Sequence, residues 1–342
     1  MYASSKKIGV FLCFMIITLA IGLMNHVIVI PPLLGAAKRD AWLSVLVAIV
    51  PLMLWVGMLA YIIKKIYPIS IYRWMSERYG KVSAWFFKGF IILYLISMAA
   101  LTLKDTMVWT HVFYLPRTPI IFIALIFTAV CLFAAISGLR AIAISSGILL
   151  PFVVIFGDFV MSFNIPKKDY SLLLPILEHG WSPVLQGLIF VGGGFSELII
   201  ILLLQPYVRK KIRYLPLLIL SLFLVLLIFG PLTGALAEFG PYEATRQRYP
   251  AFEEWRLVTI GKYIRHVDFL AIYQWLSGAF IRISIAIYLT ADAFDFKKPK
   301  IRIAYLLIVG IALIVFVQLP ISDVRYVSFM SHFYFPVTLV MV

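Results

Sequence analysis

A carboxylate, Glu197, lies in an otherwise apolar stretch, three positions after the last of three consecutive glycines, Gly192, Gly193 and Gly194. A second isolated charge, Arg282, lies within another long apolar stretch. A charge at the centre of a bilayer costs at least ~2.5–3.5 kcal/mol on insertion scales, and such residues usually serve a function. Arginine keeps its charge in proteins, so Arg282 needs an anion or backbone carbonyls as partners. These residue types offer ion pairing and solute binding.

Motifs for bond-making chemistry are missing from the sequence. It contains no glycine-rich phosphate loop ending in Gly-Lys-Ser/Thr, and its five histidines have no metal-ligand spacing. Cys13 and Cys131 are isolated in apolar stretches, which is typical of small buried side chains. Glu253 and Glu254 are adjacent in a polar segment, where we expect a solvated helix face rather than an acid–base pair. We therefore expect no enzyme, no cofactor and no metal site.

The composition indicates a membrane protein. Hydrophobic residues make up 63% of the 342 residues and charged residues only 13%, about half the share usual in soluble domains. Runs of about 20 apolar residues can cross a bilayer as helices. The predicted spans are 8–33, 41–63, 84–103, 118–137, 141–163, 185–205, 214–237, 267–290, 302–320 and a tenth that starts near 333 and is cut short. We predict an all-α membrane protein with a single domain over 1–342.

The distribution of charge predicts the orientation of these spans. Lys64, Lys65, Lys210 and Lys211 belong to a set of basic residues that fall on one side, whereas most acidic residues fall on the other. The basic side is therefore predicted to be cytoplasmic, with the N-terminus inside. The net charge of +15 indicates orientation and contact with anionic membrane lipid, and not nucleic acid binding.

The longest predicted extracytoplasmic loop covers 238–266. Within it, Ala251, Trp255 and Val258 recur at helical spacing with charges between them. This pattern predicts an amphipathic helix over the outer mouth of the bundle. The sequence leaves open whether this helix is a lid or a docking surface for a partner.

Two predicted spans carry interruptions. The three glycines weaken the sixth span by about 1 kcal/mol each relative to alanine, although small residues also allow helices to cross closely. In the first span Gly22, Asn25 and His26 interrupt the apolar run, and Pro31 follows. Breaks five spans apart match a five-plus-five inverted repeat in which the first helix of each half is discontinuous at the midplane.

These interruptions define the candidate ligand site. Residues at helical spacing on one face of the third span and on one face of the eighth span are included in this site. Such faces often serve only to pack against neighbouring helices. The candidate ligand-binding residues are Gly22, Asn25, His26, Tyr94, Ser97, Met98, Gly192, Gly193, Gly194, Phe195, Glu197, Ser284 and Tyr288. We expect Arg282 to have a structural role, either by pairing with Glu197 or by bonding carbonyls freed in the first span.

The order of short motifs resembles a known family. The breaks Met-Asn-His-Val-Ile-Val-Ile-Pro at 24–31 and Gly-Phe-Ser-Glu at 194–197 resemble those of amino-acid–polyamine–organocation transporters, with larger residues in the first break. The B subunits of spore germinant receptors fit better over nearly the whole chain. The matching segments are Asp-Ala-Trp-Leu at 40–43, Leu-Pro-Ile-Leu-Glu-His-Gly at 174–180, Phe-Ser-Glu-Leu at 195–198, Tyr-Pro at 249–250 and Gly-Ala-Phe-Ile-Arg-Ile-Ser at 278–284.

The resemblance implies a sensor of nutrients in the inner membrane of the dormant spore. It implies A and C subunits as partners and a small solute, an amino acid or a sugar, bound at the midplane between unwound helices. In related transporters a sodium ion lies between the first and eighth spans, where Arg282 would here supply a fixed cation. The alternatives are a stand-alone amino-acid transporter and a structural subunit without a ligand.

Overall fold

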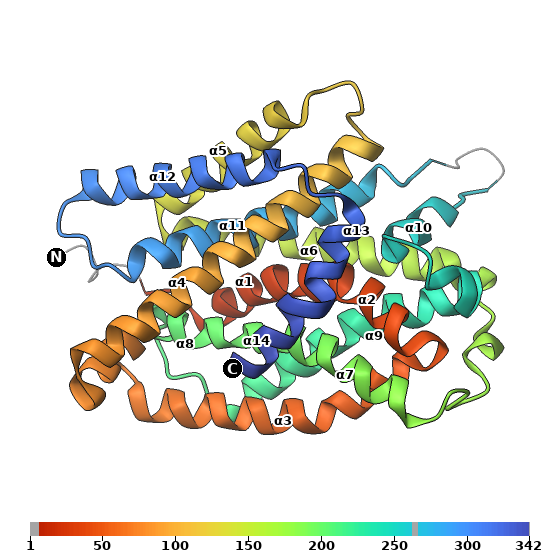
Figure 1. Cartoon of the computed structure of the whole chain (residues 1–342), viewed down its shortest axis with the longest axis horizontal. Helices are drawn as coiled ribbons and strands as arrows, with labels where there is room; N and C mark the ends of the chain where they lie inside the picture. The colour runs from red at the N-terminus through yellow and green to blue at the C-terminus, as the bar shows by residue number, and fades with distance from the viewer. Residues whose placement is uncertain (1–6, 262–265, 342) are drawn as a thin grey trace.

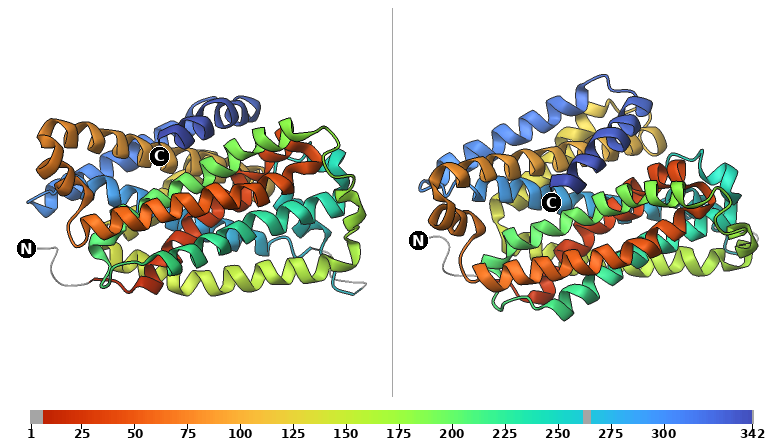
Figure 2. Two further views of the ribbon diagram at one scale, coloured as in Figure 1. Left: turned by 90° about the horizontal axis from the view of Figure 1, so that it is seen from below. Right: turned by 60° about the horizontal axis from the view of Figure 1, so that its bottom comes forward.

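The computed structural model describes residues 7–261 and 266–341, and these residues are almost entirely helical (Figure 1). Within this described part of the chain, eight helical stretches are long and apolar enough to cross a membrane. The long helices run along the long axis of the molecule (Figure 2). Large apolar side chains point outward, among them Leu54, Phe86 and Phe133, each more than 70% exposed. Such a surface belongs in lipid, so the prediction of an all-α membrane protein is confirmed.

The first apolar stretch, 10–66, crosses the molecule twice in opposite directions. The first of these two segments is continuous through three elements. It begins with α1 (Val10–Leu23), continues through a π-helical turn η1 (Met24–Ile28) and ends in α2 (Ile30–Ala37). A short 3-10 turn, η2 (Lys38–Asp40), then reverses the chain into α3 (Ala41–Ile66) (Figure 1).

The remaining long helices are α4 (Ile71–Phe113), α5 (Ile120–Ser137), α6 (Leu139–Asn164), α9 (Tyr214–Ala244), α11 (Leu270–Asp292) and α12 (Pro299–Gln318). The sixth span is α7 (Trp181–Ser196), a 3-10 turn η5 (Glu197–Ile199) and α8 (Ile200–Leu204). Shorter elements are η3 (Ile165–Lys167), η4 (Tyr170–Leu173), η6 (Gln205–Tyr207) and α10 (Pro250–Leu257). The chain ends in α13 (Asp323–Phe329), η7 (Met330–Tyr334) and α14 (Phe335–Met341).

Several helix boundaries differ from the sequence-based expectation. Helix α4 continues past 103 to Phe113, and Lys104 within it is buried and donates to the carbonyls of Val317 (2.7 Å) and Leu319 (2.9 Å). Helix α9 extends into the predicted loop 238–266, of which residues 262–265 lie outside the described residues. The last helical stretch begins at Asp323 rather than near 333, since the Ser322 hydroxyl caps it (3.4 Å to Arg325 N).

Helix α1 lies in the interior and packs against α6, α9 and α11. The largest other contacts pair α3 with α7 and α9, α4 with α11, α5 with α12, α6 with α11, and α7 with α14. The pairs α3–α9, α4–α11 and α5–α12 join spans that the five-plus-five repeat would make equivalent. The exact ten-helix repeat stays a prediction.

Both interruptions are changes of helix type, not unwound segments. In η1 the amide of Val29 donates to the carbonyl of Met24 (2.9 Å), and the backbone stays helical. The three glycines lie inside α7, so the expectation that they open the sixth helix is wrong. A Cβ at Gly193 would lie 2.8 Å from the ring of Phe335, and one at Gly194 would lie 2.6 Å from Asn25 Oδ1. The glycines instead allow α14 and η1 to approach α7 closely.

Candidate functional site

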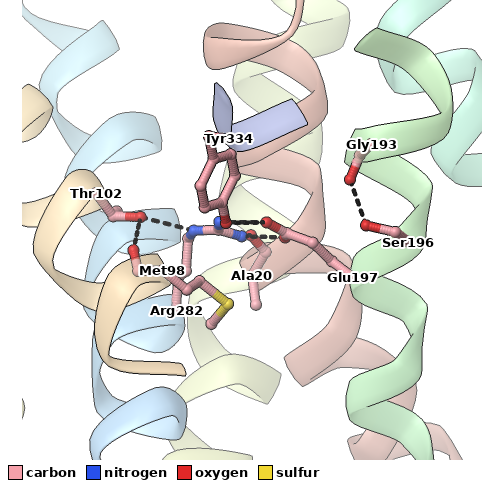
Figure 3. A network of polar contacts seen from close by, with 8 residues as sticks. All are labelled: Ala20, Met98, Thr102, Gly193, Ser196, Glu197, Arg282 and Tyr334. Atoms are coloured by element: carbon pink, nitrogen blue, oxygen red, sulfur yellow. Dashed lines mark hydrogen bonds and ion pairs between the residues drawn. The ribbon is translucent and has the colours of Figure 1, made fainter. Parts of the chain in front are cut away.

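Arg282 and Glu197 form a buried ion pair at the centre of the molecule (Figure 3). Their side chains are at most 1% exposed. Arg282 Nη2 donates to Glu197 Oε1 at 2.6 Å, while Nη1 donates to Oε2 and to the carbonyl of Ala20 (2.9 Å). Both partners considered from the sequence, the carboxylate and a first-span carbonyl, therefore bind this guanidinium.

Two further side chains and one backbone carbonyl complete what we call the charge network, made up of Arg282, Glu197, Thr102, Tyr334 and the carbonyl of Ala20. Arg282 Nε donates to Thr102 Oγ1 (2.7 Å), whose hydroxyl donates to the carbonyl of Met98 (2.7 Å). Tyr334 Oη donates to Glu197 Oε1 at 3.3 Å (Figure 3). The network joins α1, α4, η5, α11 and η7. Because each guanidinium nitrogen has a partner, it is suited to hold these elements together rather than to bind a solute.

A cavity of about 540 Å³ lies beside α1, between α6, α9, α10 and α11. This volume is in the range of sites for small molecules. Its wall is mostly apolar, and its polar members are Thr18, His26, Asp158, Lys168, Tyr170, Thr233, Glu254 and Gln274. Met161, Tyr170 and Leu226 line it and are about half exposed or more, so the cavity opens between α6 and α9.

Helix α10 covers one end of the cavity with its apolar face. Ala251, Phe252 and Trp255 line the cavity and are buried. Trp255 Nε1 donates to Gln274 Oε1 (2.8 Å), and Gln274 Nε2 donates to the carbonyl of Val153 (2.8 Å). These bonds tie α10 to α11 and α6. The amphipathic helix predicted from Ala251, Trp255 and Val258 is present as α10, and its apolar face covers one end of the cavity.

Glu254 differs from the expectation of a solvated helix face. Glu253 does lie on the outer side and pairs with the exposed Arg256 (2.9 Å), but Glu254 is only 5% exposed and lines the cavity. Burial raises the pKa of the Glu254 carboxyl well above its ordinary value, and the nearby Glu238 raises it further. A sequence signal was available, because Glu254 shares its helix face with Ala251, Trp255 and Val258.

The predicted ligand-binding residues do not form one site. Gly22 and His26 line the cavity, and His26 Nδ1 lies 3.1 Å from the carbonyl of Leu227. Glu197 belongs to the charge network, which also reaches the carbonyl of Met98. Asn25, Gly192, Gly193, Gly194 and Phe195 pack at the contact of α7 with η1 and α14 or within the core around it.

The other four predicted residues lie outside the cavity wall. Tyr94 and Ser284 are buried, and their hydroxyls have no hydrogen-bond partner among the described residues. Ser97 is half-buried on α4. The ring of Tyr288 lies under the guanidinium of Arg302, at 4.8 Å. These four stay predictions without a common site.

Sequence reasoning found Glu197, Arg282 and His26 but missed other polar members of both regions. Thr102 and Tyr334 in the charge network are uncharged and common in membrane helices, so their types gave no signal. Gln274 and Asp158 in the cavity wall come from different helices, and only the packing of α6 against α11 brings them near each other.

Comparison with known proteins identifies the family. A family model described as "Spore germination protein" matches residues 6–324. The chain is 42% identical over 317 residues to spore germination protein XB of Bacillus anthracis, covering 93% of this chain and 89% of that protein. It is 24% identical over 298 residues to spore germination protein KB of Bacillus subtilis (strain 168), covering 81% and 77%. The chain therefore belongs to the spore permease family of spore germination proteins and is an integral membrane protein.

Proposed function

We propose that the chain is the nutrient-sensing membrane subunit of a germinant receptor, and that the cavity under α10 binds the nutrient. The observation that supports this proposal is the cavity itself. It is about 540 Å³ in volume, mostly apolar, and carries a few polar groups, among them His26, Gln274 and Glu254. A small solute such as an amino acid or a sugar fits this volume.

The position of the cavity also supports a route by which binding of a solute could affect the charge network. Leu19, Gly22 and Leu23 of α1 line the cavity, and Ala20 on the same helix accepts from Arg282. A solute that moves α1 therefore acts on the charge network and, through Tyr334, on the C-terminal helices. In this proposal the signal passes to the receptor's A and C subunits, and the protein lies in the inner spore membrane with its N-terminus in the cytoplasm.

A cysteine placed in the cavity tests the proposal. Gly230 lines the cavity, and a Cβ there would meet nothing within 4 Å, so Gly230→Cys adds a thiol without a clash. The native Cys13 and Cys131 are buried, so the parent chain should react little with a maleimide. We expect solutes that trigger germination to slow labelling of the new cysteine in the full-length protein.

The matched control is Gly35→Cys on α2. Gly35 is exposed, also has open space around its Cβ and does not line the cavity. No solute should change its labelling. If germination-active solutes leave both cysteines equally reactive, the cavity is not the nutrient site. Accumulation of labelled solute in vesicles containing only this chain would instead favour a stand-alone transporter.

A further inference from the structure

Two buried carboxylates, Glu238 and Glu254, lie near Lys168 at the α10 end of the cavity. The side chains of Glu238 and Lys168 are at most 1% exposed, and Lys168 Nζ lies 3.5 Å from Glu238 Oε1. Glu254 is 5% exposed and lines the cavity together with Lys168. The cavity wall also contains the carboxylate of Asp158. This end of the cavity therefore has more carboxylates than cations among the described residues.

The oxygen atoms of this pair are not satisfied. Among the described residues, Glu254 Oε1 and both carboxylate oxygens of Glu238 accept no hydrogen bond, although Glu238 Oε1 is ion-paired with Lys168 Nζ at 3.5 Å. Among these same residues, Glu254 has no ion pair of this kind. Leaving a buried carboxylate without a partner costs several kcal/mol, so such a group takes up a proton or a cation. The charge network shows the opposite arrangement, since Arg282 satisfies Glu197 there.

The backbone holds the Glu254 carboxylate in place. The backbone carbonyl of Glu254 accepts a hydrogen bond from Asn164 Nδ2 at 2.7 Å, which ties α10 to α6. The carboxylate lies against α9 at Gly234, where a Cβ would come within 2.9 Å of both of its oxygens. A glycine at this position leaves the room that Glu254 occupies. The carboxylate is thus a positioned group of the cavity wall.

The remainder of the wall indicates what kind of cation fits. No group of three or more His, Cys, Asp or Glu side chains that could hold a metal ion occurs in the described part of the chain. Apolar side chains such as Leu23, Val153 and Trp275 line the cavity beyond Glu254. An ammonium group on an apolar body matches both features, because it offers hydrogen-bond donors to the carboxylates and apolar surface to the wall.

We infer that Glu254, with Glu238 beside it, is the subsite that selects solutes bearing an ammonium group on an apolar body over neutral solutes of the same shape. This inference rests on the proposed function, since it assigns the recognition of the solute within the same cavity. Glu254 is the residue that touches the ammonium group, and the ion pair of Glu238 with Lys168 lies beside it.

Matched amines and alcohols test this selectivity in the Gly230→Cys protein. The probes are pairs such as isobutylamine and isobutanol, or cyclohexylamine and cyclohexanol, each measured by the concentration that halves labelling of the cysteine. Hydrogen bonds to charged groups are worth more than neutral ones, and we expect at least one amine to protect at a concentration about tenfold or more below that of its alcohol. Glu254→Gln should bring this ratio close to one.

Two control variants separate selectivity from damage to the fold. Glu253→Gln changes the adjacent carboxylate on the outer side and should leave the ratio unchanged. Glu254→Asp keeps the charge and should retain part of the preference. The labelling rate without solute should be the same in all variants, which checks that the cavity is intact.

The outcomes distinguish this inference from the proposed function. Equal protection by amine and alcohol in every pair, or an amine preference that survives Glu254→Gln, overturns the inference and leaves the cavity as the nutrient site. Loss of the preference on replacing lithium chloride by potassium chloride at equal concentration would show that a free potassium ion occupies the subsite, which also overturns it. If neither the probes nor germination-active solutes protect the cysteine, the proposed function fails as well.

Discussion

The charge network and the cavity under α10 place buried charges in opposite situations. In the network, Arg282 has a partner at each guanidinium nitrogen and joins five elements of the fold. In the cavity, Glu254 is nearly as buried, yet one of its oxygens has no partner among the described residues. Complete compensation fixes a structure, whereas incomplete compensation leaves a place for a ligand. Both regions contain residues of α1, so a movement of α1 caused at the cavity would also act on the charge network.

The largest effect is expected from breaking the ion pair of the network. Removing one member of a buried pair typically costs ~3–5 kcal/mol, because the other charge is left uncompensated. Arg282→Met should therefore greatly reduce the amount of protein in the membrane and the nutrient response, while Arg282→Lys should keep part of both. Immunoblots of membranes and germination assays measure the two quantities.

A double variant sharpens this prediction. Adding Glu197→Gln to Arg282→Met removes the stranded carboxylate, so some protein and response should return. A double variant no better than Arg282→Met would mean that the bonds from Arg282 to Ala20 and Thr102 matter more than the pair. Parent-like behaviour of Arg282→Met alone would contradict a structural role for the whole network.

Two glycine substitutions compare packed space with open space. A side chain at Gly193 meets the ring of Phe335 and its backbone oxygen (3.0 Å), whereas one at Gly230 enters the cavity. Overpacking costs about 1–3 kcal/mol, so Gly193→Leu should lower thermal stability, measured by the temperature of aggregation in detergent. Gly230→Leu should leave stability near that of the parent and abolish the nutrient response. The reverse pattern would mean that the cavity is not the sensing site.

The pH dependence of solute binding should follow Glu254. Burial and the neighbouring Glu238 raise the pKa of its carboxyl, while Lys168 acts against this. Below the raised pKa the group is neutral and cannot pair with an ammonium group. The amine-over-alcohol preference should therefore be small at low pH and grow as the pH rises through that pKa, since alkylammonium groups stay charged to about pH 10. The preference should be independent of pH in Glu254→Gln, and a parallel rise in that variant would exclude Glu254 as the cause.

The smallest effect concerns the closure of α10. Trp255→Phe keeps the aromatic surface but removes the hydrogen bond to Gln274, which is worth about 1 kcal/mol. We expect the nutrient concentration for half-maximal germination to rise several-fold, with no change in protein level. Trp42→Phe is a suitable control, because the indole nitrogen of Trp42 has no partner among the described residues and Trp42 does not line the cavity. Equal shifts in both variants would contradict a specific role for the α10 contact.

The sequence was sufficient for the fold class because the lipid environment imposes long apolar runs, which composition reveals directly. The isolated charges Glu197 and Arg282 likewise indicated that each needs a partner of opposite charge, and in the structure they form an ion pair. The type of each interruption was not predictable, since a π-turn at Asn25 or a close crossing at Gly193 depends on what packs against the helix. The same residues are compatible with an unwound segment.

The cavity could not be predicted, since it is a gap left between side chains of several helices and turns and has no motif of its own. Glu254 was misjudged because its neighbours in sequence are polar, although its helical spacing from Ala251 and Trp255 placed it inward.

The most direct test of the central claim compares two dose curves for each active solute. One is the concentration that half-protects the cysteine of Gly230→Cys, and the other is the concentration that half-activates germination of spores carrying the same variant. If the cavity under α10 is where the nutrient is sensed, the two concentrations should rise and fall together across a series of solutes. Solutes that activate germination fully while the cysteine stays unprotected would contradict the claim.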